Sequence, residues 1–153
     1  MQFLFKVVSL LRVFAFAAVV PFLLRLKLPR LARILEPGSD PTAVGENRVK
    51  TIAGYVEIAI RCGKPFVRPG CLTRGLTRYY FLRRAGLDVA LCFGMGRLGK
   101  GFMGHCWLEK AGEPFLEAED PRPRYREMYR ISRAGSQAST PAGARERMGF
   151  SVP

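Results

Sequence analysis

The sequence predicts a single α+β domain, with helices in the first half of the chain and a small antiparallel sheet in the second. Apolar residues recur with helical spacing up to about residue 85, and beyond it they alternate with the period of a strand. A short turn, Ala111-Gly112-Glu113, separates two strand-like segments and predicts a hairpin. A chain of 153 residues is long enough for one domain with a hydrophobic core.

The first 35 residues are apolar and basic, and we expect one or two buried helices, broken near Pro21. Residues 13–24 carry no charge and are bracketed by Arg12 and Arg25. This run is shorter than the roughly 20 residues that a membrane span needs, so association with a membrane surface and a true span are the second and third interpretations. The alanines before Pro21 make a poor cleavage site for a signal peptide.

Two further helices are expected after a turn at residues 37–41. The first covers residues 46–61, where apolar residues follow the helical period. A loop with two prolines and two glycines then leads into a helix over 71–85, and Gly86 is placed to end it. The arginines of this helix are expected on its solvent side or at its end, namely Arg74, Arg78, Arg83 and Arg84.

Strands are expected over residues 88–94, 103–109 and 114–117. A short helix through Tyr129 is expected to follow Asp120. From Ser132 onward small and polar residues dominate, and we expect a mobile tail because little apolar surface offsets its ordering entropy. The predicted organisation is therefore an N-terminal helical region (1–36), a central core domain (45–130) and a C-terminal tail (131–153).

The charge is strongly basic, with 25 Lys and Arg against 12 Asp and Glu, a formal net charge of +13. Such a surface attracts anions, but the arginines are scattered and no nucleic-acid-binding motif occurs, so we expect no nucleic-acid partner. The cysteines form no C-x-x-C pair, and the chain is large enough to fold without disulfides. Reduced thiols in a cytoplasmic setting are expected for Cys62, Cys71, Cys92 and Cys106.

Cys71 is the candidate nucleophile. A proline- and glycine-rich loop delivers it to the start of a helix, where free N–H groups and the helix dipole favour a thiolate. The same N–H groups can stabilise an oxyanion. The alternative is a buried, inert cysteine, which is the better interpretation for Cys62, Cys92 and Cys106.

His105 is the only histidine and therefore the candidate general base. A carboxylate on the partner strand of the hairpin would fix the tautomer of its ring, and Glu117 occupies that place. Glu109 lies four residues along the same strand and is too far to orient the ring directly. Glu119 and Asp120 are rivals that simple solvated charges would also explain.

Two other kinds of site have little support. Residues 94–99 match G-x-G-x-x-G, a motif of nucleotide-binding sites. In such sites a helix follows the glycines, whereas a strand is expected here, so we interpret the glycines as a hairpin connection at the rim of the site. A metal site would need Cys71, Cys92, His105 and Cys106, and none of the usual short ligand spacings is present. We expect no cofactor and no metal.

Three motifs occur in order along the chain: Cys71-Leu72-x-Arg74-x-Leu76, then Leu82-Arg83-Arg84-Ala85-Gly86-Leu87 before a strand, then His105-x-Trp107-x-Glu109. Together they resemble the transglutaminase-like (papain-like) cysteine peptidases. They look most like the leader-peptidase B proteins of lasso-peptide biosynthesis. The resemblance covers about residues 45 to 120, and the apolar, arginine-dotted N-terminus also fits.

The resemblance implies a nucleophile helix packed on an antiparallel sheet and a triad of Cys71, His105 and Glu117. The family usually has Asp at the third position and His-Ala-Trp where this chain has Cys106 after the histidine. The implied activity is removal of the leader from a ribosomally made lasso precursor peptide. The implied partners are that precursor, a separate small leader-binding protein and an asparagine-synthetase-like cyclase, and the length of the chain suits the split type.

Two alternatives are kept beside the peptidase. One is a non-catalytic peptide-binding or membrane-surface module of the same fold, attached through its N-terminus. The other is an acyl transferase, because hydrolysis and transfer share the acyl-enzyme.

Overall fold

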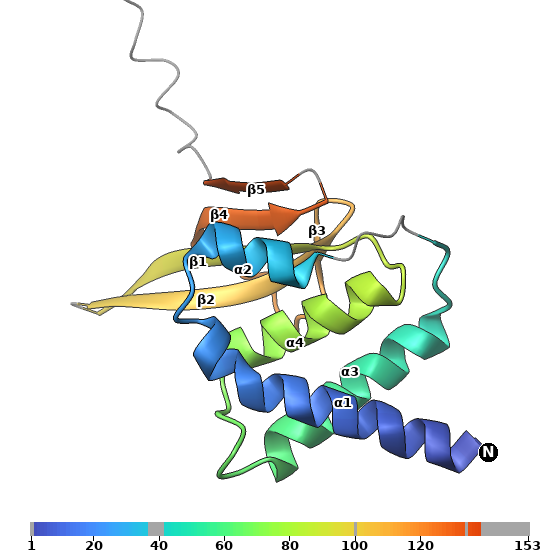
Figure 1. Ribbon diagram of the computed structural model, residues 1–153. Coiled ribbons are helices and arrows are strands. Elements are labelled where there is room, and N and C mark those ends of the chain that lie inside the picture. The colour runs from blue at the N-terminus through green and yellow to red at the C-terminus, as the bar shows by residue number, and fades with distance from the viewer. Residues whose placement is uncertain (1, 37–41, 100, 134, 139–153) are drawn as a thin grey trace, which may run out of the picture.

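The residues that the structure describes form a helical layer of four helices packed on a five-stranded antiparallel sheet (Figure 1). This computed structural model describes residues 2–36, 42–99, 101–133 and 135–138. The predicted α+β class is confirmed. The helices are α1 (Gln2–Leu23), α2 (Leu28–Leu35), α3 (Glu46–Cys62) and α4 (Cys71–Arg84). The strands are β1 (Ala90–Leu98), β2 (Gly101–Lys110), β3 (Glu113–Phe115), β4 (Arg126–Ser132) and β5 (Gly135–Ala138).

α1 packs against α3 and α4 along one side only. Val13, Ala17 and Val20 lie one turn apart on that side and are at most 2% exposed. The helix continues through Pro21, and Leu24 N still donates to Val20 O at 3.0 Å. The predicted break at Pro21 is therefore wrong: a proline in the last turn removes only one hydrogen bond, and the helix ends after Leu23.

α2 completes the helical layer and ties it to the sheet. Leu31 and Leu35 are at most 1% exposed and share a core cluster with Leu76 of α4 and Leu91 of β1. α2 and the region that follows residue 45 therefore share one core cluster.

α3 and α4 have nearly the predicted bounds, and Gly86, at φ +100°, ends the second of them. The arginines of α4 were expected on its solvent side or at its end, and Arg83 does lie in the last turn, but it does not face solvent. Its side chain is 2% exposed, and it donates to Glu36 at 3.0 Å and to Asp88 at 2.8 Å. A buried guanidinium needs such carboxylate partners, and both lie outside α4 in the sequence.

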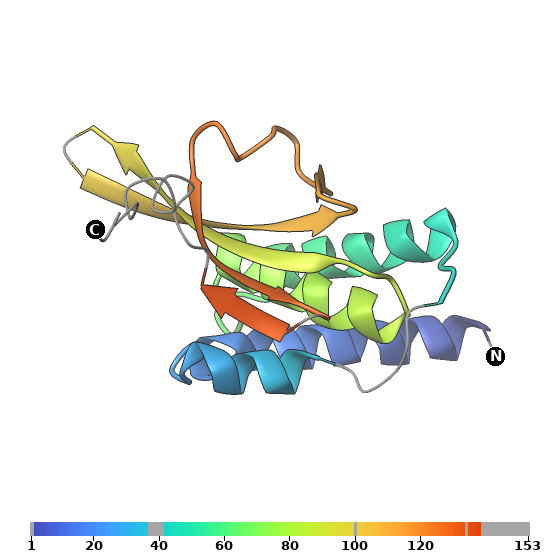
Figure 2. The same ribbon diagram turned by 90° about the horizontal axis from the view of Figure 1, so that it is seen from above.

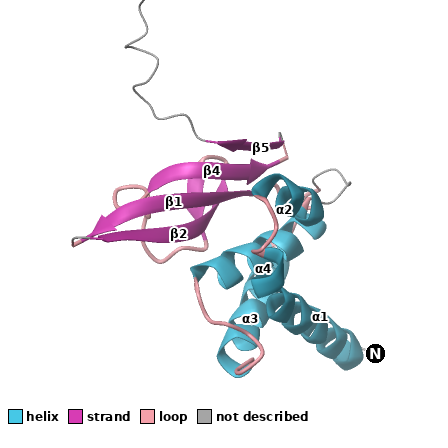
Figure 3. Ribbon diagram, turned by 60° about the vertical axis from the view of Figure 1, so that its left-hand side comes forward, coloured by secondary structure: helices cyan, strands magenta, loops and turns pink. Residues whose placement is uncertain are grey.

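The strand order is β3-β2-β1-β4-β5, with antiparallel pairing throughout. Figure 3 shows β2, β1, β4 and β5 side by side in this order. The predicted hairpin between β2 and β3 is confirmed, and its turn residues Ala111 and Gly112 both have positive φ. Pairing with β3 covers only residues 108–110 of β2. Between β3 and β4 the chain loops out on the side of β2 (Figure 2).

The segment after Asp120 forms a strand where a helix was predicted. β4 pairs with β1, and its Ile131 is fully buried opposite Leu91. The predicted start of the tail at residue 131 falls inside this strand, and residues 135–138 add β5. Sheet pairing thus supplies partners that composition alone did not reveal. The remainder of the predicted tail, residues 139–153, lies outside the described residues.

The predicted hairpin connection holds only for the end of the glycine-rich run: Gly99, at φ 58°, lies in the turn from β1 to β2, whereas Gly94 and Gly96 belong to β1. A Cβ on Gly94 would lie 2.6 Å from the ring of Trp107, and one on Gly96 would lie 2.2 Å from Arg124 O. These glycines are needed because a buried ring and a neighbouring backbone approach the strand closely.

Candidate active site

α4 begins at Cys71, as the sequence predicts for the nucleophile helix. The preceding residue, Gly70, has no side chain to cap the helix, and its carbonyl accepts the first helical bond from Arg74 N at 3.0 Å. The N–H groups of the first turn therefore have no side-chain acceptor at the cap position. Cys71 is half-buried and lines a hollow of about 390 Å³ together with Pro21, Leu24 and Arg68.

A close contact holds α4 on the strand that carries His105. Gly75 lies one turn after Cys71, and a Cβ at this position would be 2.7 Å from Cys106 Sγ. Cys106 is 2% exposed and directly follows His105 in β2. Because Gly75 has no side chain, the helix start and this part of β2 can lie against each other.

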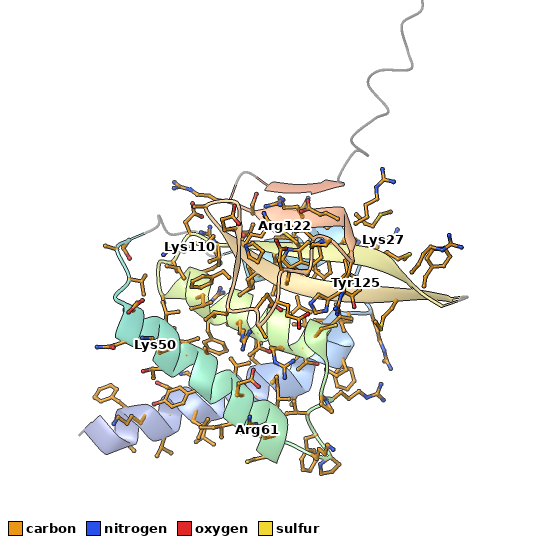
Figure 4. The ribbon with its side chains drawn as sticks, turned by 180° about the vertical axis from the view of Figure 1, so that it is seen from behind. Lys27, Lys50, Arg61, Lys110, Arg122 and Tyr125 are labelled. Atoms are coloured by element: carbon orange, nitrogen blue, oxygen red, sulfur yellow. The ribbon has the colours of Figure 1, made fainter. Side chains whose placement is uncertain are left out.

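His105 and Glu117 form a pair, with 3.7 Å between His105 Nε2 and Glu117 Oε2. This distance is longer than a hydrogen bond, so the contact is an ion pair when the ring is protonated. Their side chains are 24% and 19% exposed, which leaves the pair partly open to solvent. The imidazole stacks on Tyr125, with ring centroids 4.8 Å apart, and more distantly on Trp107. Figure 4 shows the side of the molecule that carries Tyr125.

Arg78 of α4 fixes the segment that carries Glu117. Its Nη1 donates to Leu116 O at 2.9 Å, and Leu116 adopts a positive φ of 61°. Its Nη2 donates to Glu57 of α3 at 3.0 Å, and Glu57 also accepts from Arg74 Nε at 2.8 Å. Arg78 and Arg74 therefore join α3, α4 and the carboxylate segment. The expectation of a solvent-side position is wrong for Arg78, whose side chain is 11% exposed, whereas that of Arg74 is 39% exposed and partly faces solvent.

Burial raises the pKa of Glu117, and the positive charges of His105, Arg78 and Arg74 offset this only in part. Burial likewise raises the pKa of Cys106, and negative charge on Cys71 and Glu117 raises it further. Both groups therefore act electrostatically on Cys106.

Replacement of Glu117 by glutamine should raise the melting temperature at pH 7. The pKa of Glu117 is higher in the folded chain than in the unfolded one, so the folded chain binds more protons at pH values between the two pKa values. The free energy of unfolding therefore falls as the pH rises from the unfolded pKa through the folded pKa. Removing the charge should add about 1–4 °C at pH 7 and nothing below about pH 4. Thermal unfolding followed by circular dichroism at both pH values measures this. The matched control is Glu119→Gln, because Glu119 is exposed. A lower melting temperature for Glu117→Gln than for the wild type at pH 7 would contradict a raised pKa of Glu117.

The rival carboxylates have other partners. Glu109 accepts from Trp107 Nε1 at 3.1 Å and from Arg130 Nη2 at 2.6 Å, so it supports the strand face and does not contact the His105 ring. The two remaining rivals form exposed ion pairs with nearby arginines: Asp120 with Arg122 at 2.7 Å and Glu119 with Arg124 at 3.6 Å. Both match the interpretation as solvated charges.

The other cysteines lie away from solvent or away from His105. Cys62 is exposed at the end of α3, whereas Cys92 is buried, and burial raises the pKa of its thiol. Among the described residues, Cys92, Glu109 and Glu127 place potential metal ligands within 4.8 Å of one another. Arg130 donates to both carboxylates of this cluster, so a guanidinium already compensates their charge.

Sequence reasoning missed Arg78 and Tyr125. Arg78 follows Cys71 by seven residues, so two helical turns place it on the same stripe of α4, and this spacing is visible in the sequence. Tyr125 has no such signal, because only the path of the chain between β3 and β4 brings it to His105.

Comparison with known proteins gives one match. The sequence model of the transglutaminase-like superfamily matches residues 10–130, which include residues 10–23 of α1 as well as the paired His105 and Glu117. No curated protein and no solved structure matches the chain significantly.

Proposed function

Since the chain belongs to the transglutaminase-like superfamily, we propose that it is a cysteine peptidase that removes the leader from a lasso precursor peptide. The observation that carries the catalytic part is the pairing of His105 Nε2 with Glu117 Oε2 at 3.7 Å, next to a helix that begins with Cys71. A base oriented by an acid, close to a thiol at a helix start, is the arrangement that nucleophilic catalysis requires.

In the proposed reaction, Cys71 Sγ attacks the carbonyl carbon of the scissile peptide bond. His105 takes the thiol proton on Nδ1, since its Nε2 faces Glu117, and passes this proton to the departing amine. The C–N bond breaks and a thioester remains on Cys71. Water then adds to the thioester, His105 takes a proton from it, and the acid product leaves as the thiol reforms.

The roles of the surrounding groups follow from their positions. The uncapped N–H groups at the start of α4 would stabilise the tetrahedral oxyanion. Stacking on Tyr125 and the negative charge of Glu117 would hold the imidazole in place. Arg78 is a positioning residue, because it acts on Glu117 through the Leu116 carbonyl and touches no reacting atom.

The substrate and partners belong to the proposal as well. The hollow beside Cys71 would receive residues next to the scissile bond, and Arg68 in its lining suits an acidic side chain. A net charge of +13 favours an acidic leader. A separate small leader-binding protein would present the precursor, and an asparagine-synthetase-like cyclase would take the released core.

The test is to incubate the chain with a synthetic lasso precursor and its leader-binding protein and to weigh the products. The proposal expects a leader that ends in a free carboxylate and an intact core peptide. An added primary amine captured as an amide in place of water would indicate an acyl transferase. Absence of cleavage, together with precursor binding, would indicate the non-catalytic module.

A second readout uses thiol alkylation in a Cys62→Ser background, which removes the exposed thiol. Cys71 should then react rapidly with iodoacetamide near neutral pH, since Cys92 and Cys106 are buried. The added variant His105→Ala should slow the reaction. Slow alkylation of Cys71 that is independent of His105 would count against the nucleophile.

A further inference from the structure

The outer face of α1 is apolar and uncovered in the described residues. It carries exposed apolar side chains along the length of the helix, including Leu4 at 67%, Leu11 at 60% and Phe22 at 63%. At 100° per residue these three lie within about 20° of one another and opposite the buried Val13 and Ala17. The exposed members of this outer face are Leu4, Val8, Leu11, Ala15, Val19 and Phe22.

This pattern differs from that of an ordinary surface helix. A helix that packs on a soluble core has polar residues on its far side, whereas α1 is apolar on both sides. In Figure 1, α1 runs along the outside of the helical layer, and no described element covers its outer face. We therefore expect the outer face of α1 to be covered by an apolar partner.

The charge around α1 indicates the chemistry of that partner. Residues 1–35 contain no Asp or Glu and six cations, namely Lys6, Arg12, Arg25, Lys27, Arg30 and Arg33. The guanidinium of Arg25 lies over the ring of Phe22, 5.4 Å from its centroid, so a cation adjoins the end of the outer face. Apolar side chains bordered by cations match the acyl region and the phosphates of an anionic bilayer.

We propose that the outer face of α1 binds the surface of an anionic lipid bilayer, with the helix lying in the plane of the interface. α1 is also long and apolar enough to span, with a mean hydropathy of 2.0 over Leu4–Leu23. A span would expose Val13, Ala17 and Val20, which pack in the protein core at 2% exposure or less. Interfacial binding uses only the outer face and leaves the core intact.

The experiment is flotation of the full chain with two kinds of vesicle: phosphatidylcholine alone, and phosphatidylcholine with one third phosphatidylglycerol. The wild-type chain should float with the anionic vesicles and far less with the neutral ones. The double variant Leu11→Asp/Phe22→Asp should reduce the bound fraction about tenfold, because it places charges in the apolar region. Arg25→Glu/Lys27→Glu should weaken binding to anionic vesicles only.

The matched control carries the same substitutions at apolar residues that are equally exposed elsewhere. Phe66 and Phe102 are 71% and 73% exposed, so Phe66→Asp/Phe102→Asp should float like the wild type. Circular dichroism of every variant checks that it is folded. Loss of flotation in a folded Leu11→Asp/Phe22→Asp chain, with the control unchanged, supports the proposal.

Three results would overturn it. The first is a wild-type chain that floats with neither vesicle, or equally with both. The second is a chain that stays with the vesicles after alkaline carbonate extraction, which would indicate a span. The third is a dimer, seen by light scattering, that Leu11→Asp/Phe22→Asp dissociates in the absence of any vesicle binding.

Discussion

The substitution Cys71→Ala should reduce precursor cleavage by about 10⁴-fold or more, because no other thiol can form the acyl-enzyme. The chain should remain folded, since the change removes a single atom from a half-buried side chain at the edge of the core. Mass spectrometry of the cleavage products measures the first effect, and thermal unfolding measures the second.

Cys62→Ala is the matched control, because Cys62 is exposed at the far end of the loop that leads to Cys71. Its activity should equal that of the wild type. His105→Ala should lose nearly as much activity as Cys71→Ala, and the double variant should lose no more than the worse single one, since base and nucleophile act as a unit. Cleavage by a folded Cys71→Ala chain at an undiminished rate would refute the proposed nucleophile.

The substitution Gly75→Ala should impair both stability and activity. The added Cβ would lie 2.7 Å from Cys106 Sγ and 3.4 Å from Leu91, so either the Cys106 side chain must rotate within the core or α4 must move away from the sheet. Overlap in a packed core typically costs about 1–3 kcal/mol, and the better helix propensity of alanine returns about 1 kcal/mol. Displacing Cys71 from His105 by about 1 Å should reduce cleavage by roughly 10²-fold.

Cys106→Ala provides the rescue. It removes the sulfur that the new Cβ would meet, and the next atoms stand at 3.4 Å and 3.7 Å. The double variant Gly75→Ala/Cys106→Ala should therefore recover most of the stability and activity, with a coupling free energy of about 1 kcal/mol or more. Chemical denaturation of the four chains measures this coupling. Strictly additive losses would show that the helix does not rest on Cys106.

Local pattern was sufficient to predict the helix that begins at Cys71 and the hairpin that carries His105. The predicted strand over 114–117 is wrong at its end, because β3 stops at Phe115 and Glu117 lies in the loop that follows it. The period of the apolar residues, the glycine that ends the helix and the turn residues each involve only a few neighbouring positions, so the sequence alone reveals them. In β2, Cys106 meets α4 and Trp107 lies on the other face, as the alternation of side chains along a strand requires.

Hydrogen-bond and strand partners that are distant in sequence could not be predicted. Arg78 donates a hydrogen bond to Leu116 O, 38 residues away in the sequence, and Arg83 donates to Glu36, 47 residues away. A run of arginines on a helix is usually solvated, and only the assembled fold shows that carboxylates and a carbonyl surround these two. β4 was missed for a related reason, since its place in the sheet depends on pairing with β1.

The contact between Arg78 and the Leu116 carbonyl has a mechanical consequence. The segment just before Glu117 is fastened to the sheet by β3 and to the helical layer by this hydrogen bond. This segment therefore connects the helical layer to the sheet next to His105 and Glu117. Motions that would separate α4 from the sheet are resisted at this point, so the hydrogen bond fixes the position of the segment before Glu117 relative to α4.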